Sequence, residues 1–193
     1  MKPDDDPIAL FDRWYAAADA AEADACAVAL STATPDGLPS SRMVLVKHWG
    51  PEGFVVYTNL GSRKARELAV NPNAALLWHW KSQKRQIRVE GSVERVPDPE
   101  ADAYWASRPR VSQLGAWASR QSEPLNGHLE LERRVAATTA RFPIGAVPRP
   151  EFWSGFRVRP RAIEFWEDRE FRLHMRWRFT ATSSGWAMQE LYP

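Results

Sequence analysis

Residues 42–68 read RMVLVKHWGPEGFVVYTNLGSRKAREL, and this stretch decides how the rest of the chain is organised. Its pattern predicts a strand that ends at His48, a turn over 50–53, a second strand over 54–58 and a helix that opens at Ser62. The second strand is rich in β-branched and aromatic residues, which favour a pleated sheet. We therefore expect a hairpin followed directly by a helix at the centre of the fold.

Cationic side chains gather at both ends of this stretch. Arg42 and Lys47 lie at the ends of the first strand, and Arg63 and Lys64 lie in the first turn of the helix. With Ser62 as N-cap, the free amides of that turn point at whatever lies in front of them. A helix N-terminus beside cations suits a phosphate. The alternative is an ordinary hairpin and helix with solvated cations, and spacing alone leaves both open.

The composition is that of a globular protein with one core. Its 193 residues are 44% hydrophobic and 26% charged, which is enough to bury a core without disulfides or a structural metal. The net charge of +2 is too small to indicate a nucleic-acid partner or an anionic membrane surface. Cys26 is the single cysteine and lies in an apolar run, so we interpret it as a buried hydrophobic residue.

Nothing in the sequence indicates export or membrane insertion. The N-terminus is acidic at residues 4–6 and lacks the apolar segment of a signal peptide. No apolar run reaches the length of a membrane-spanning helix. We therefore expect a cytoplasmic protein with no membrane partner. The ten tryptophans suit a flat ring ligand or a large interface, although packing of a β-rich core explains most of them.

Hydrophobic periodicity outside the central stretch predicts further helices and strands. The N-terminal half is predicted to contain an amphipathic helix over 7–21 and strands over 25–33, 74–80 and 85–96. Five strands joined mostly by short turns favour a closed or nearly closed antiparallel barrel.

The C-terminal half is predicted to begin with a short helix from Pro97 through Trp105 and an irregular segment over 107–122. A long helix over 123–142 follows, with Leu129, Leu131, Val135 and Ala136 on its inner face. Three further strands are predicted over 156–158, 161–166 and 171–179, and the segment 186–191 closes the chain. No interdomain linker is visible.

Six short blocks, read in order, resemble one known family. They are Arg42 to Lys47, Tyr57 to Lys64, Ser107-Arg108-Pro109-Arg110, Gln113 to Trp117, Gln121-Ser122 and Arg172-Leu173-His174. Their order and spacing are similar to those of the pyridoxamine (pyridoxine) 5′-phosphate oxidase family, and the likeness runs from about Asp6 to Pro193. One block alone would be weak support, whereas six in register are specific.

The resemblance implies a fold, a cofactor and a reaction. The expected fold is mainly β with flanking helices, an antiparallel FMN-binding split β-barrel. Residues 1–193 would form one domain, with a dimerisation and substrate-site segment over about 150–193. The protein would be a homodimer with FMN at the interface. It would oxidise pyridoxine or pyridoxamine 5′-phosphate to pyridoxal 5′-phosphate and return dioxygen as hydrogen peroxide, and no metal is expected.

The resemblance also implies roles for individual residues. The expected FMN contacts are Arg42, Met43, Val44, Leu45, Val46, Lys47, Tyr57, Thr58, Arg63, Lys64, Gln86, Gln121, Ser122, Trp166 and Arg176. The expected grip on the substrate phosphate consists of Lys47, Tyr104, Arg108 and Ser112. Arg172 and His174 would lie over the pyridine ring and act as the catalytic pair.

These residue types fit flavin chemistry. A flavin accepts a hydride only from a carbon held against its reactive face, so the protein's main tasks are positioning and electrostatics. Two phosphates in one site require several cations. Two residues apart on a predicted strand, Arg172 and His174 would share one face. The predicted site residues also have ordinary interpretations. Trp166 can be read as a core aromatic and His174 as a hydrogen-bonded surface group.

Three departures from the family pattern affect the substrate side. Met175 and Val111 each stand where the family usually has Asp, which makes the area more positive and more apolar. Family members also carry a longer N-terminal segment, with an Arg-Arg-x-Tyr-like stretch, before the position of Asp6. We therefore hypothesise intact FMN binding with an altered substrate preference or turnover.

Other functions remain open from the sequence. A related split-barrel flavin oxidoreductase acting on another amine or alcohol is one alternative. A non-catalytic protein that binds FMN or pyridoxal phosphate is a second, and a haem-binding relative of the same barrel is a third. The segment from Trp166 to Pro193 favours the oxidase, because generic split-barrel flavoproteins need not carry it.

Overall fold

The computed structural model describes residues 6–193, the side chain of His128 excepted. The chain builds the elements α1 (Pro7–Asp19), β1 (Ala27–Ala33), β2 (Pro39–Gly50), β3 (Gly53–Asn59), α2 (Arg63–Val70), β4 (Asn73–Trp80), β5 (Arg85–Arg95), α3 (Asp98–Ser107), α4 (Arg110–Ala118), α5 (His128–Arg141), β6 (Trp153–Glu167), the 3-10 turn η1 (Glu170–Arg172), β7 (Met175–Thr182) and β8 (Gly185–Leu191).

The strands form a closed antiparallel barrel with a two-stranded extension. The sheet order is β3-β2-β1-β4-β5-β6-β7-β8, and an additional β3–β6 pairing closes the first six strands. The β2–β3 ladder joins only Val46–Gly50 to Gly53–Val56, so the first half of β2 has a free edge. The barrel is therefore split between β2 and β3, and the antiparallel split barrel expected from the resemblance is confirmed.

Long strand β6 closes the barrel because two glycines let it approach closely. A Cβ at Gly91 would lie 1.9 Å from the carbonyl oxygen of Arg159, beside a bulge in the β5–β6 ladder. A Cβ at Gly53, whose φ is +122°, would lie 2.2 Å from the carbonyl oxygen of Val158. No other residue fits these positions without moving the strand.

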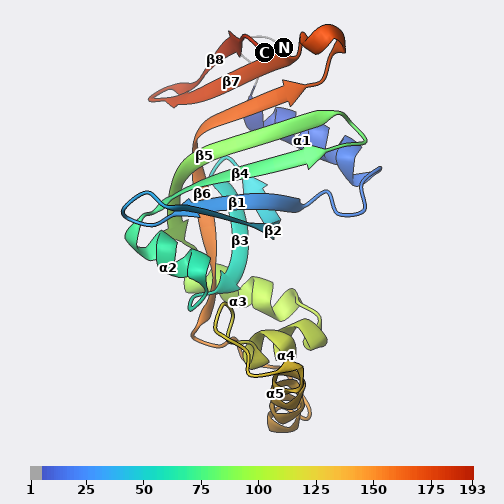
Figure 1. Cartoon of the computed structure of the whole chain (residues 1–193), viewed down its shortest axis with the longest axis vertical. Coiled ribbons are helices and arrows are strands. Elements are labelled where there is room, and N and C mark those ends of the chain that lie inside the picture. Colours follow the sequence, from blue (N-terminus) through green and yellow to red (C-terminus); the bar gives the residue numbers. More distant parts are fainter. Residues whose placement is uncertain (1–5) are drawn as a thin grey trace.

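Helices cover the barrel at distinct places (Figure 1). Helix α1 packs its apolar face on the barrel, and its Phe11 is fully buried among Phe54, Trp78 and Trp80. Helices α3, α4 and α5 gather at one end of the molecule, and β7 and β8 lie at the opposite end. Within residues 6–193, no helix is long and apolar enough to span a membrane.

Most predicted elements are confirmed, including the central hairpin and the helix after Ser62. The expected irregular segment over 107–122 is wrong, because Arg110–Ala118 forms α4. Helix α5 begins at His128 rather than at residue 123. The inner face predicted for this helix is also wrong. In the single chain, Leu129 and Leu131 are exposed by 46% and 40%. Asp4 and Asp5 of the acidic N-terminus lie outside the described residues.

The C-terminal prediction needs two corrections. The strands expected over 156–158 and 161–166 are one continuous strand, because β6 pairs with β3 at one end and with β7 at the other. The strand expected to start at Phe171 starts at Met175 instead. Phe171 and Arg172 have φ of 56° and 61°, left-handed values that turn the chain rather than extend it. The strand-face relation inferred for Arg172 and His174 is therefore wrong.

Candidate functional site

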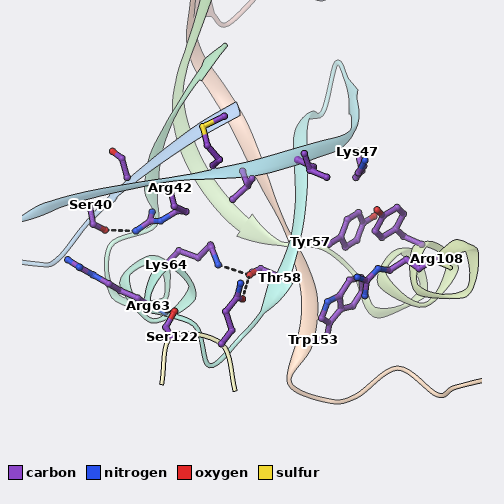
Figure 2. A pocket seen from close by; sticks show the side chains of 16 residues that line it. Ser40, Arg42, Lys47, Tyr57, Thr58, Arg63, Lys64, Arg108, Ser122 and Trp153 are labelled. Carbon is purple, nitrogen blue, oxygen red and sulfur yellow. Dashed lines mark hydrogen bonds between the residues drawn. The ribbon is translucent and has the colours of Figure 1, made fainter. Parts of the chain in front are cut away.

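A cleft of about 580 Å³ lies at the split in the barrel (Figure 2). Strands β2, β3 and β6, helices α2 and α3, the α3–α4 junction and the α4–α5 loop contribute its walls. Its lining residues are Ser40, Ser41, Arg42, Met43, Val44, Leu45, Lys47, Tyr57, Thr58, Arg63, Lys64, Tyr104, Arg108, Gln121, Ser122 and Trp153. This volume lies in the usual range for small-molecule and cofactor sites.

The structure gathers most predicted site residues into this cleft, although they come from distant parts of the sequence. Of the residues predicted from the resemblance, the cleft contains Arg42, Met43, Val44, Leu45, Lys47, Tyr57, Thr58, Arg63, Lys64, Tyr104, Arg108, Gln121 and Ser122. Val46 differs, because its side chain is only 2% exposed and belongs to the barrel core. Any ligand contact at that position would have to use the backbone.

At one end of the cleft, Lys64 is a buried ammonium without a counterion. Its residue is 6% exposed, and its Nζ donates hydrogen bonds to Thr58 Oγ1 at 2.9 Å and Ser62 Oγ at 3.3 Å. No carboxylate of the described residues lies within 4 Å of it. Burial, and secondarily Arg42, lower its pKa to about 8. An unpaired buried cation is costly unless a ligand neutralises it.

Glu67 organises the two arginines at the same end. Its carboxylate is 6% exposed, pairs with Arg63 Nε at 2.8 Å and lies 3.4 Å from Arg42 Nη2. It also accepts hydrogen bonds from Thr32 Oγ1 at 2.5 Å and Ser40 Oγ at 2.7 Å. Burial alone would raise the pKa of Glu67, but these hydrogen bonds and Arg63 outweigh it and lower the pKa to about 2.

The α4–α5 loop closes this end over the start of α2. Ser62 occupies the N-cap position, as predicted, but its side chain makes no capping hydrogen bond. The backbone N–H of Arg63 instead donates to Ser122 Oγ at 3.2 Å, and Ser122 has a left-handed φ of 73°. Thr58 Oγ1 donates to Gln121 Oε1 at 3.0 Å. The loop therefore brings two predicted ligand contacts to the cationic end.

Strand β2 forms the middle of the cleft. Its free edge runs beside Met43 and Leu45, which are 65% and 41% exposed. A shift of register between Val46 and His48 marks a bulge at Lys47. Bulges re-aim side chains, and Lys47 Nζ lies in the cleft region 3.6 Å from Cys26 Sγ. The middle thus offers apolar surface and free backbone groups, which suit a flat heteroaromatic ring.

The other end of the cleft holds a second cation, set among aromatic rings. The guanidinium carbon of Arg108 lies 4.9 Å from the ring centroid of Trp153 and 5.2 Å from that of Trp105. Its Nη1 is buried and has no hydrogen-bond partner among the described residues. Burial lowers the pKa of Arg108. Figure 2 shows Arg108 and Trp153 together, across the cleft from Arg42 and Lys64.

Tyr57 and Tyr104 complete this aromatic end. Their rings stack with centroids 3.9 Å apart, and the ring of Tyr57 is nearly parallel to that of Trp153. The hydroxyl of Tyr57 is buried without a hydrogen-bond partner among the described residues. Burial, and then Glu100, raise the pKa of Tyr57 to about 12. Tyr57 therefore stays a neutral hydroxyl that a ligand could engage.

Several site residues escaped prediction from the sequence. Ser40, Ser41 and Trp153 line the cleft, and Glu67 orients its arginines from behind. Glu67 stands four residues after Arg63. This spacing on a helix favours an ion pair, so the sequence alone could have predicted the contact. Nothing local marks Trp153, because only the β3–β6 pairing brings residue 153 opposite Asn59.

The remaining predicted residues lie outside the cleft of their own chain. Gln86, Trp166 and Arg176 face one another across β5, β6 and β7 on the outer side of the sheet. Ser112 is exposed on α4. Arg172 lies in the turn before β7, and the ring of His174 packs 4.8 Å from that of Trp166. The backbone N–H of Arg169 donates to His174 Nδ1 at 3.2 Å.

This outer side is one continuous surface that reaches the cleft. Cross-strand partners connect Met43 through Ala29 and Leu77 to Arg88. Beyond Arg88 lies an ion cluster, defined by Arg88, Glu90, Glu164, Arg176 and Arg178. Arg88 and Arg176 both bind the buried Glu164, at 2.8 Å each.

Two arginines, Arg176 of the ion cluster and Arg110 of α4, lie next to the positions where the family usually has Asp, residues 175 and 111. Arg176 is held by Glu164 and by the carbonyl oxygen of Tyr192, and Arg110 is held by the carbonyl oxygens of Phe142 and Gly145. Both arginines therefore have partners without an Asp at 175 or 111. Met175 is half-buried, whereas Val111 is 82% exposed.

Comparison with known protein families finds two matches that together cover most of the chain. Residues 16–142 match the family described as "Pyridoxamine 5'-phosphate oxidase". Residues 153–193 match the "Pyridoxine 5'-phosphate oxidase C-terminal dimerisation region". The boundary between them falls before β6, which belongs to the barrel.

Curated relatives share more than half of their residues with the chain. A pyridoxine/pyridoxamine 5′-phosphate oxidase of Sphingopyxis alaskensis is 60% identical over 190 residues, covering 98% of this chain and 88% of the relative. The protein of the same name from Rhodospirillum rubrum is 57% identical over 196 residues, covering 98% of each chain.

Solved structures extend the comparison to the fold. PhzG from Burkholderia lata, in complex with tetrahydrophenazine-1-carboxylic acid, is 34% identical with a TM-score of 0.93, covering 100% of this chain and 95% of PhzG. A pyridoxamine 5′-phosphate oxidase-related, FMN-binding protein from Nostoc punctiforme has a TM-score of 0.77, covering 95% of this chain and 96% of its own. At 16% identity it supports the fold alone.

Proposed function

This chain belongs to the pyridoxamine 5′-phosphate oxidase family, and we propose that it is the FMN-dependent enzyme that makes pyridoxal 5′-phosphate. Its substrates are pyridoxine 5′-phosphate and pyridoxamine 5′-phosphate, and dioxygen is reduced to hydrogen peroxide. The whole chain acts as one domain, because β6 belongs both to the barrel and to the C-terminal extension.

The observation that supports this proposal best is the buried ammonium of Lys64, which has no carboxylate partner among the described residues. Lys64, Arg42 and Arg63 converge on one end of the cleft, and Glu67 offsets a single charge. A phosphate dianion placed there removes the cost of burying Lys64 without a partner. The N–H groups at the start of α2 and the hydroxyl of Ser122 add hydrogen-bond donors. This end therefore fits the phosphate of FMN.

The middle of the cleft fits the ring of the same cofactor. The apolar side chains of Met43 and Leu45 offer a surface for a flat ring, and the free backbone edge of β2 offers partners for its polar rim. Thr58 and Gln121 close the side nearest the phosphate end. When bound, FMN takes the electron pair and hydrogen from the substrate and passes them to dioxygen.

The aromatic end fits the substrate phosphate. Lys47 and Arg108 supply positive charge without a carboxylate partner among the described residues, and Tyr104 supplies a hydroxyl beside them. A phosphate held there places the substrate's pyridine ring toward the middle of the cleft, against the cofactor surface. The work of these residues is to fix distance and orientation, on which hydride transfer depends.

The outer side of the sheet supplies the rest of the site through a homodimer. Met43, Leu45 and Leu77 expose an apolar row beside the cleft, which favours burial against a second copy. Such a dimer carries Gln86, Trp166 and Arg176 of one subunit toward the FMN of the other. Arg172 and His174 then cover the substrate ring from the partner side. The matched dimerisation region over residues 153–193 supports this arrangement.

An anaerobic spectrum tests the proposal. We expect purified protein loaded with FMN to bleach on addition of pyridoxine 5′-phosphate or pyridoxamine 5′-phosphate without oxygen. Pyridoxal 5′-phosphate forms in this bleaching step, and with the amine substrate water is consumed and ammonia is released. The colour returns on aeration, when dioxygen is reduced to hydrogen peroxide. Loaded protein that stays yellow with both substrates contradicts the proposed activity, and protein that cannot be loaded contradicts the cofactor site.

A second candidate is a flavin oxidase of the same fold with another ring substrate. Two observations favour testing it: Met175 and Val111 make the substrate side less acidic, and PhzG is similar over the whole chain. Tetrahydrophenazine-1-carboxylic acid, the ligand named with PhzG, is a suitable probe. Bleaching by this acid and not by the B6 phosphates would favour the second candidate. A non-catalytic FMN carrier would bleach with none of them.

A further inference from the structure

Arg108 is held in the cleft in an unusual way. Arg108 is half-buried, and an arginine withdrawn from solvent normally pairs with a carboxylate. Within residues 6–193, however, no carboxylate lies within 4 Å of this guanidinium. Two indole rings take that place, those of Trp105 and Trp153, at 5.2 and 4.9 Å from the guanidinium carbon. Both tryptophans are nearly fully buried, at 3% and 4% exposed.

The two tryptophans differ in what else they touch. Trp105 donates its indole N–H to the carbonyl oxygen of Val147 at 2.7 Å and does not line the cleft. Trp153 lines both the cleft and a side cavity of about 240 Å³ next to it. The ring of Trp153 is fixed by contact with Trp105 and with the nearly parallel ring of Tyr57. Trp153 is therefore the cleft-facing half of the support under Arg108.

We propose that Trp153 is a positioning residue, which holds the guanidinium of Arg108 by a cation–π contact and so keeps its charge and N–H groups free for the substrate's phosphate. A carboxylate would orient Arg108 equally well, but it would neutralise the charge and occupy the donors. An aromatic face attracts the cation without consuming a single N–H. Among the described residues the buried Nη1 has no hydrogen-bond partner, so the protein itself does not consume this donor.

This inference rests on the proposed function only in naming the anion as the substrate's phosphate. The binding of inorganic phosphate to the FMN-loaded protein tests it independently of turnover. We expect Trp153→Leu to weaken phosphate about tenfold, a change typical of a desolvated cation–π contact. Trp153→Phe, which keeps a ring face, should lose less than threefold. Both are measured by calorimetry and as competitive inhibition of the oxidase.

A matched control is available in the same chain. Trp117 lies 4.9 Å from the guanidinium carbon of Arg141, donates its indole N–H to a carbonyl oxygen and lies outside the cleft. Trp117→Phe and Trp117→Leu should leave phosphate affinity unchanged. In an Arg108→Met background, Trp153→Leu should have no further effect, because the two residues act as one unit.

An isosteric change separates electrostatics from packing. Tetrafluorotryptophan placed at residue 153 keeps the shape of the ring but removes the negative potential of its face. We expect phosphate affinity to fall about as far as in Trp153→Leu, with FMN affinity and melting temperature unchanged. This variant also covers the case in which Trp153→Leu does not fold.

Two results overturn the proposal: undiminished phosphate binding with the fluorinated ring, or an equal loss in the Trp117 variants. Wild-type protein that binds phosphate, shows these losses and oxidises no B6 phosphate contradicts the proposed function while supporting the role of Trp153. For the oxidase itself, the expected signature is a raised KM for the phosphorylated substrate with kcat nearly unchanged.

Discussion

The two ends of the cleft each present a cation, buried in the case of Lys64 and half-buried in the case of Arg108, but they hold it by different means. At the Lys64 end, hydroxyls and the carboxylate of Glu67 form a polar network around the charges. At the Arg108 end, aromatic rings surround a guanidinium whose Nη1 has no partner among the described residues. Under the proposed function, the polar end holds the cofactor and the aromatic end holds the substrate.

The polar network at the Lys64 end and the aromatic rings at the Arg108 end should respond differently to a change of pH. The network contains titratable groups, Lys64 and Glu67, whose pKa values are shifted to about 8 and about 2. The aromatic end holds a guanidinium, which stays charged over the whole working range of pH. Mutations and changes of pH should therefore affect ligand binding differently at the two ends of the cleft.

The largest effect is expected from removing the ammonium at the network end. Lys64→Met should weaken FMN by about 100-fold, because a charge-assisted hydrogen bond to phosphate is lost. Flavin fluorescence titration measures this, and Lys81→Met, on the exposed β4–β5 turn, is the matched control. Phosphate binding at the Arg108 end should not change in FMN-saturated protein. An FMN affinity within threefold of wild type would contradict the assignment of the phosphate end.

The next effect concerns stability in acid. Because the folded-state pKa of Glu67 lies near 2 rather than its ordinary 4.5, its ionisation stabilises the fold above pH 4.5. That contribution, about 3 kcal/mol at most, disappears as the pH falls from 4.5 toward 2. Urea unfolding of FMN-free protein between pH 5 and 3 should show a steeper loss for wild type than for Glu67→Gln. Equal slopes would mean that Glu67 titrates normally.

A pH titration of FMN affinity sharpens the comparison further. The Lys64 pKa of about 8 means that free protein loses the ammonium above pH 8. FMN affinity should therefore fall about tenfold between pH 8 and 9.5, while the cofactor phosphate stays a dianion. Inorganic phosphate at the Arg108 end should bind equally well at both values. A flat FMN profile would place the titrating group elsewhere.

The smallest effect is expected from restoring the two missing carboxylates. Met175→Asp and Val111→Asp lie outside the cleft, so FMN affinity should stay within twofold of wild type. Because each adds negative charge on the substrate side, the ratio of kcat/KM for the amine and alcohol substrates should change about threefold. Steady-state kinetics with both substrates measures this. Unchanged kinetics would refute the hypothesis of an altered substrate side.

Much of this molecule could be predicted from local pattern. The hairpin and helix over residues 42–68 follow from alternating apolar residues, turn chemistry and the position of Ser62. Apart from Arg108, the cations of the cleft stand inside these short elements, so the same stretch that forms the split also carries Arg42, Lys47, Arg63 and Lys64.

Prediction failed where the outcome depended on distant partners. Helix α4 is only nine residues long, and it packs against α5 from another part of the sequence. Leu129 and Leu131 stand two residues apart, which places them on different faces of a helix, and one chain leaves both exposed. The turn at Phe171 and Arg172 uses left-handed backbone angles that neither residue type signals.

The sequence by itself determined the barrel, its central hairpin and the chemical types at the cofactor end, because propensity and spacing act over a few residues. Only the tertiary structure decided that Glu67 also lies beside Arg42, that Ser122 rather than Ser62 caps α2, and that Trp153 lies under Arg108. Each of these contacts joins residues that the sheet or a loop brings together. Such contacts depend on closure of the barrel, which no local stretch of sequence encodes alone.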